Sequence, residues 1–286
     1  MIRALLGAAL LLYFLSAHAA LILDYPAIVT DVSPKPPVSA FHDWTEANAA
    51  ADLIVAAWKT EPASLSLTRL QLSLHIKHKT MPTRGARGLA LMHVAMHEAY
   101  QLAIEQKQEP RLAMLMASAS VLSYLYVPEE REFERITFAV AAKITGKLPE
   151  TLSVTTLQAF SLGKAVGERV MERALHDGAQ RDWNGARLQW YGQGRYFGPG
   201  SWEPTPPYFY YPPDEPFAPT WQTWNLKSAS QFRSEPPAFG SAEYRKDLAE
   251  VIQINQHLTD AQLKIAKYWW MDTEVLLLQA VGIRSQ

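Results

Sequence analysis

Two histidines one helical turn apart are the side chains whose spacing most directly suggests chemistry. His93 and His97 lie in the segment LMHVAMHEAY, and on a helix both imidazoles would face one side, where they could chelate zinc. The metalloprotease motif places its glutamate directly after the first histidine, whereas Glu98 follows the second and points off the shared face. Spacing supplies no third ligand. We therefore expect both histidines to pack or to hydrogen-bond at a helix interface, and we predict no metal site.

A pair of cations suggests a second kind of chemistry. Lys77 and Arg84 have six residues between them, the spacing that opens the phosphate-binding signature of the phosphatidic acid phosphatase type 2 superfamily. In that signature the cations stabilise phosphate or vanadate oxygens. The proline that should follow the arginine is Gly85 here, and no Ser-Gly-His sequence occurs in the 286 residues. We expect the basic pair to lie on a solvated face.

Nucleophilic catalysis has no clear candidate. The sequence contains no Gly-x-Ser-x-Gly motif and no cysteine. The adjacent carboxylates Asp214 and Glu215 could suggest a glycosidase, but neighbouring acidic residues in a proline-rich segment are expected to be exposed. We therefore assign no catalytic residue. The candidates retained for binding are Lys77, Arg84, His93 and His97.

Composition limits the function further. The chain has 27 basic and 28 acidic side chains, whereas a general nucleic-acid binder carries a basic face, so we predict no nucleic-acid partner. Without cysteine there is no disulfide and no thiolate metal site.

The N-terminus has the pattern of a secretory signal peptide at residues 1–19. Arg3 is followed by an apolar stretch from Ala4 to Leu15 and by Ala17-His18-Ala19, which fits a small-x-small cleavage site. The apolar stretch is shorter than the roughly 20 residues that a membrane-spanning helix needs. We expect a secreted or periplasmic protein that has no membrane association after cleavage.

The elements that must position the candidate residues are helices. Residues 20–42 form an irregular lead-in, and the sequence after it lacks βαβ alternation and a glycine-rich phosphate loop. Apolar periodicity, caps and prolines predict an all-α bundle of about seven helices. Their approximate bounds are 43–61, 84–103, 111–126, 129–145, 155–176, 241–257 and 259–270. Asp43 is the expected N-cap of the first helix, and residues 65–76 fit either a helix or a strand.

Two further features concern packing. Gly163 and Gly167, four residues apart, are what a close helix–helix contact would require. Residues 182–240 form an irregular arm rich in proline and aromatic residues, with eight prolines between Gly198 and Thr220. Proline excludes a long helix or a central strand there. We expect the arm to be extended and ordered, with its rings buried against the helical body.

Six segments, in order, carry a resemblance to a known family. They are ARGLALMHVAMHEAY at 86–100, LGKAVGERVMERALHDGA at 162–179, GSWEPTPP at 200–207, WNLKSASQFRSEPP at 224–237, EYRKDLAEV at 243–251 and TDAQLKIAKYWW at 259–270. With this order the chain, over residues 43–270, resembles the N-terminal half of bacterial vanadium-dependent haloperoxidases, relatives of the phosphatidic acid phosphatases. His97-Glu98 departs from the family, in which an aromatic residue followed by aspartate is expected.

The resemblance implies a helical half that supports a C-terminal catalytic half. In the family, that second half supplies the residues that hold vanadate, and full-length relatives oxidise halide with hydrogen peroxide or hydrolyse phosphate esters. None of those residues occurs here, so we expect a truncated peroxidase-like protein that is inactive alone and carries no cofactor. The tail 271–286 has no family counterpart. Read in another frame with suitable codons it continues like the family, which predicts a frameshift.

Two expectations about partners follow. Core faces that the missing half would cover predict self-association of the chain. The alternative is an exported helical binding module whose aromatic arm engages a ligand or partner.

Overall fold

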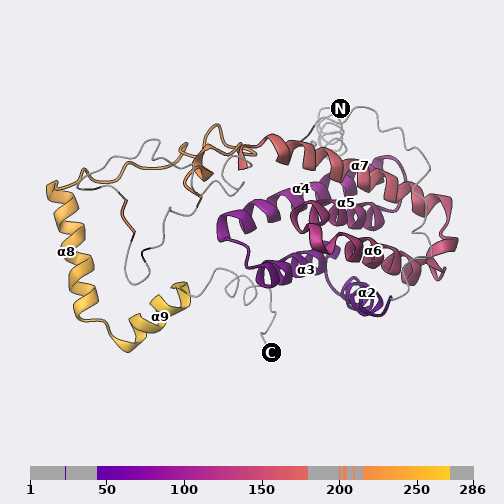
Figure 1. Cartoon of the computed structure of the whole chain (residues 1–286), viewed down its shortest axis with the longest axis horizontal. Coiled ribbons are helices and arrows are strands. Elements are labelled where there is room, and N and C mark those ends of the chain that lie inside the picture. The colour runs from indigo at the N-terminus through magenta and orange to yellow at the C-terminus, as the bar shows by residue number, and fades with distance from the viewer. Residues whose placement is uncertain are drawn as a thin grey trace, which may run out of the picture. The chain divides into compact units, whose positions relative to one another are not determined.

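The computed structural model describes Leu23 and residues 44–179, 200, 202–204, 209 and 215–270, with side chains as far as residue 266. Over these residues the chain forms eight α-helices and no strand (Figure 1). The α-helices are α2 Thr45–Ala57, α3 Ala63–His78, α4 Pro82–Glu105, α5 Pro110–Leu125, α6 Glu130–Thr145, α7 Val154–His176, α8 Ala242–Gln256 and α9 Asp260–Trp270. The all-α prediction is confirmed. The signal peptide, the rest of the lead-in and the tail lie outside the described residues.

The helix that the periodicity left open is α3, which covers residues 65–76. Its buried positions include Leu67, Gln71, Leu74 and His75, which follow the helical spacing i, i+4, i+7, i+8. Two of these four residues are polar, so the hydropathy pattern alone did not distinguish a helix from a strand.

Two of the helix caps predicted from the sequence are present in the structure, and one is not. Gly146 ends α6 with φ of +66°, a left-handed conformation that costs glycine little. Ser241 caps α8, where its hydroxyl accepts a hydrogen bond from the backbone N–H of Tyr244 at 3.1 Å. The expected cap of α2 is wrong: the N-cap position is taken by Trp44, which makes no side-chain cap hydrogen bond. Asp43 lies outside the described residues.

The described chain groups into two compact units. The first contains the described residues up to Gln71 together with Gly88–Met171, and the second contains Leu72–Arg87 together with the described residues from Glu172 onward. The helices α3, α4 and α7 therefore contribute residues to both units. In the first unit α6 packs against α2 and α5.

A close contact between α5 and α7 completes the core of the first unit. A β-carbon on Gly163 would collide with the backbone carbonyl of Ala113, and one on Gly167 would lie 2.5 Å from the β-carbon of Ser120. The two glycines therefore let the helices approach each other closely. The close contact predicted from their spacing is confirmed.

The second unit contains the described part of the arm and the last two helices. Residues 215–240 contain a single 3-10 turn, η5 Ala218–Thr220, and no α-helix. On α8 no residue is buried, and the described side chains of α9 are exposed as well. Val251 of α8 and Ile265 of α9, for example, are 63% and 59% exposed.

The expectation that the rings of the arm are buried is wrong for the described residues. Phe232 is 82% exposed, and Trp202, Phe209 and Phe239 are exposed too. Phe217, Trp221 and Trp224 are half-buried. The physical reason for the intermediate burial of the two tryptophans is that arginine side chains lie over their faces.

Candidate functional site

The first unit has a pocket that contains both candidate histidines. It has a volume of about 480 Å³ and lies where the end of α2 and the start of α3 meet α4 and α5. His93, His97 and Tyr100 line it from α4, Trp58 and Glu61 from the α2–α3 connection, and Arg111 from α5. The spacing of i, i+4 and i+7 puts the three α4 residues on one face of the helix.

The hydroxyl group of Thr68 indicates the tautomer of His93. The Thr68 hydroxyl donates to the backbone carbonyl of Ser64 at 2.8 Å, and the same oxygen lies 3.1 Å from Nε2 of His93. Because the hydroxyl proton is already used, Thr68 must accept from His93, so Nε2 carries a proton and Nδ1 has a free lone pair. The surrounding protein lowers the pKa of His93 below its usual range, which favours this neutral form.

Trp58 forms a rigid wall of the pocket. Its indole N–H donates to the carbonyl of Ala63 at 3.1 Å and to the hydroxyl of Ser66 at 2.9 Å. The guanidinium carbon of Arg111 lies 5.6 Å from the centre of the Trp58 ring, within the range of a cation–π contact. The indole ring is therefore fixed on its edge by hydrogen bonds and on its face by a cation.

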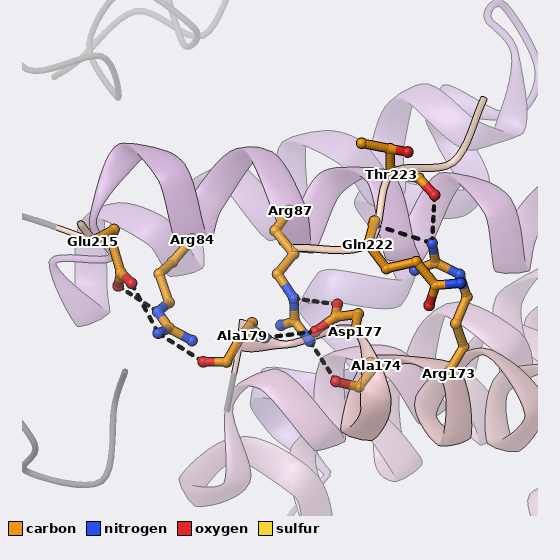
Figure 2. A network of polar contacts seen from close by, with 9 residues as sticks. All are labelled: Arg84, Arg87, Arg173, Ala174, Asp177, Ala179, Glu215, Gln222 and Thr223. Carbon is orange, nitrogen blue, oxygen red and sulfur yellow. Dashed lines mark hydrogen bonds and ion pairs between the residues drawn. The ribbon is translucent and has the colours of Figure 1, made fainter. Parts of the chain in front are cut away.

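Arg84, the third candidate, belongs to a polar network in the second unit (Figure 2). Its Nε and Nη2 donate to the two carboxylate oxygens of Glu215 at 2.5 and 3.0 Å, and Nη2 also donates to the carbonyl of Ala179 at 3.0 Å. The side chains of Arg84 and Glu215 are only 16% and 3% exposed. The interpretation of Arg84 as part of a solvated pair is therefore wrong, and so is the expected exposure of Glu215.

Arg87 makes the neighbouring connection in the same network. Its Nε donates to Asp177 at 2.7 Å and its Nη2 to the carbonyl of Ala174 at 2.8 Å, so it binds the last turn of α7 and the residue after it. The other oxygen of Asp177 accepts from the backbone N–H of Ala179 at 3.0 Å. Because the pair is nearly buried, each charge depends on the other.

Arg173 completes the network from α7. Its Nη2 donates to the carbonyls of Gln222 and Thr223 at 3.2 and 3.0 Å (Figure 2). Its guanidinium carbon lies 3.5 Å from the centre of the Trp224 ring. Burial lowers the pKa of Arg173, Asp177 raises it, and Arg87 lowers it. We call these three arginines with Asp177 and Glu215 the arginine clamp, because together they hold residues 174–179 and 215–224.

The four predicted binding residues therefore separate into different environments. His93 and His97 line one pocket, Arg84 is saturated within the clamp, and Lys77 is exposed on the last turn of α3. Sequence reasoning missed Arg87, Arg173 and Asp177 in the clamp, and Trp58 and Arg111 in the pocket. The clamp has one local pattern in the sequence, the segment Arg84-Gly85-Ala86-Arg87-Gly88, in which each arginine precedes a glycine. This pattern predicts no function by itself.

Two other kinds of feature are absent from the described residues. No group of three or more histidine, aspartate or glutamate side chains there is arranged to hold a metal ion. None of the helices in the described ranges is both long enough and apolar enough to cross a membrane. No protein-family model, curated protein or solved structure matches the chain.

Proposed function

We propose that this chain is the supporting helical half of an exported vanadium haloperoxidase-like or acid phosphatase-like enzyme. In this proposal the residues that hold vanadate or phosphate belong to another helical body, and the chain is inactive alone. The observation that carries the proposal is that no other described part of the chain covers α8 and α9. Both helices contain large apolar residues, yet none of their described side chains is buried.

The apolar residues of these helices form the proposed docking surface. They are Leu248, Val251, Ile252 and Ile254 on α8, Leu258 in the connection, and Leu263 and Ile265 on α9. Large contiguous apolar surfaces in a folded protein are typical of interaction sites. Covering such side chains contributes about 25 cal/mol per Å² of apolar area removed from water.

The state of Arg84 also supports this division of labour. An oxyanion site needs cations whose donors point at the anion. The donors of Arg84 instead bind Glu215 and Ala179, so a vanadate or phosphate ion would have to displace a buried carboxylate. Arg84 fits a structural role better than a catalytic one, which agrees with catalytic residues placed elsewhere.

The direct test is an assay of peroxide-dependent bromination in the presence of vanadate. The chain alone should give no activity above a no-protein control, and it should give none in phosphate-ester hydrolysis. Addition of a separately produced catalytic half of a bacterial vanadium haloperoxidase should restore bromination. Bromination by the chain alone would overturn the proposal.

A pair of variants links any restored activity to the surface on α8 and α9. Val251→Asp and Ile265→Asp place charges on the docking surface and should abolish restoration, whereas Gln253→Asp on α8 is the polar control. Because Val251 and Ile265 are exposed, their substitution should leave the unfolding of the chain itself unchanged.

A binding module that uses the arm is the second candidate. It is favoured by the exposed rings of Phe209, Phe232 and Phe239, which a purely structural arm would bury. If Phe232→Ala weakens capture of a ligand or partner while the α8 and α9 variants do not, this candidate replaces the first.

A further inference from the structure

We propose that the pocket of the first unit, where His93, Trp58 and Arg111 meet, is a binding site for a small aromatic monocarboxylate. The inference does not rest on the enzyme assignment, since every residue that it uses lies in the first unit. It rests instead on the size of the pocket, on its apolar walls and on a guanidinium group with unused donors.

The size and walls of the pocket suit a single aromatic ring. Its volume of about 480 Å³ lies in the range of roughly 300–1,000 Å³ that is typical of small-molecule sites. Trp58, Met96 and Met114 supply the apolar surface. The tryptophan offers a flat face, and methionine side chains adapt to the edge of an aromatic ring and contact it favourably.

Arg111 supplies the charge that would select a carboxylate. Its Nε forms an ion pair with Glu109 at 3.0 Å, which offsets part of its charge, but its two terminal nitrogens donate to no residue in the part of the chain that the structure describes. The side chain is 44% exposed, so a ligand can reach these nitrogens from solvent. A guanidinium edge with free N–H groups matches the two oxygens of a carboxylate.

The other ionisable groups of the pocket restrict the charge of the ligand. Glu61 is also in the wall, but Arg69 forms an ion pair with it and offsets its negative charge. Partial burial lowers the pKa of His93, which favours its neutral form. Arg111 is the one arginine or lysine among the described residues that line the pocket, which favours a ligand with a single carboxylate.

The pocket needs little reorganisation to bind such a ligand. The two hydrogen bonds of the Trp58 indole N–H and the contact with Arg111 already fix the ring. Groups that are ordered before binding lose less conformational entropy when the ligand arrives. The ring of the ligand would lie against the indole and the methionines, with its carboxylate at the outer end of Arg111.

The test is calorimetric titration of the full chain with benzoate and indole-3-acetate at neutral pH. Benzamide tests the charge, since it keeps the ring and loses the carboxylate, and acetate tests the ring, since it keeps only the carboxylate. Benzoate or indole-3-acetate should bind at least about tenfold more tightly than benzamide or acetate, because charge-assisted hydrogen bonds are about twice as strong as neutral ones.

Three variants locate the site. Arg111→Gln should weaken binding of the aromatic carboxylate about tenfold, Arg111→Lys should have an intermediate effect, and Arg131→Gln should change it less than twofold. Arg131 is an exposed arginine of α6 outside the pocket, which makes it the matched control. Circular dichroism should show the same helix content in all three variants.

Two results would overturn the proposal. One is the absence of binding of either carboxylate at concentrations up to about 10 mM, where even a weak specific site would be filled. The other is equal binding by Arg111→Gln and the unchanged chain. Neither result depends on the bromination assay, so failure of this inference and failure of the proposed function are distinguishable.

Discussion

The α5–α7 contact of the first unit and the arginine clamp of the second bring distant parts of the chain together by different means. In the first, glycines remove the side chains that would hold two helices apart, and the backbones touch. In the second, guanidinium groups reach carboxylates and backbone carbonyls at the end of α7 and in the irregular residues 215–224 (Figure 2). A packed contact depends on two surfaces of complementary shape, whereas a charged contact depends on partners of opposite sign.

The difference decides how each region responds to substitution. A packed helix pair tolerates polar changes at its rim but not added volume, because the neighbouring backbone cannot move aside. A clamp tolerates changes of volume at its rim but not the loss of one charge, since the remaining charge is then buried without a partner. Four measurements test this contrast.

The largest effect is expected from Gly163→Val. Its β-carbon would meet the carbonyl of Ala113, and two methyl groups would add to the collision, so the free energy of unfolding should fall by about 3 kcal/mol or more. Urea unfolding followed by circular dichroism measures the loss.

The control for this experiment is Gly146→Ala at the end of α6. This glycine has positive φ but no atom within 4 Å of a β-carbon position, so the variant should lose only about 1 kcal/mol from backbone strain. An equal loss in both variants would show that conformational freedom, and not close packing, explains the glycines of α7.

The next effect is expected from Glu215→Gln in the clamp. Arg84 would keep its hydrogen bond to Ala179 but lose its carboxylate, and residues 215–224 should become about 2 kcal/mol easier to open. Hydrogen exchange of the backbone amides in that segment is the appropriate measurement, because local opening need not unfold the first unit.

An exposed ion pair provides the matched control. Lys164 and Glu168 lie one turn apart on α7 with side chains 62% and 57% exposed, and Glu168→Gln should have almost no effect on stability. If Glu215→Gln is equally silent, the clamp does not hold the arm and the contrast between the two regions fails.

Much of the fold could be predicted because helices leave local signals. The caps Gly146 and Ser241, the stop at Asp177-Gly178 and the glycine spacing of α7 all act within a few residues, and the structure has each of them. The helix α3 was left open because Gln71 and His75 interrupt its apolar face. A local pattern cannot show that a polar residue is buried.

The sites were harder to predict because their partners are far apart in sequence. Arg84 and Glu215 are separated by 131 positions, and Arg87 and Asp177 by 90. No periodicity links such pairs, so Arg84 was interpreted as solvated and Glu215 as exposed. The two histidines were placed on one face correctly because i, i+4 spacing is local, but Trp58 and Arg111 of the same pocket come from other helices.

A smaller effect, of opposite sign, is expected inside the first unit. Gln71 is fully buried, and neither its amide nitrogen nor its amide oxygen has a hydrogen-bond partner in the described structure. Gln71→Met keeps the length of the side chain and removes both polar atoms, so the free energy of unfolding should rise by about 1 kcal/mol. The exposed Gln253→Met on α8 is the control and should change stability little. Destabilisation by Gln71→Met would show that the amide is satisfied, for example by an internal water molecule.

The smallest effect is a pH dependence that His75 brings to the second unit. Burial lowers the pKa of His75 below the value of about 6.5 that it has in the unfolded chain. The unfolded state therefore takes up a proton first as the pH falls. The stability contributed by the neutral imidazole is present above the unfolded-state pKa and is lost as the pH falls toward the folded-state pKa.

His75→Gln removes this titration, so the free energy of unfolding should fall less between about pH 7.5 and pH 5.5 than in the unchanged chain. His93, whose pKa is also lowered, still contributes to the pH dependence of the variant. Urea midpoints at constant ionic strength measure the two slopes. Identical slopes for the variant and the unchanged chain would mean that the imidazole of His75 accepts a proton as readily in the folded chain as in the unfolded one, and its burial would then carry no electrostatic cost.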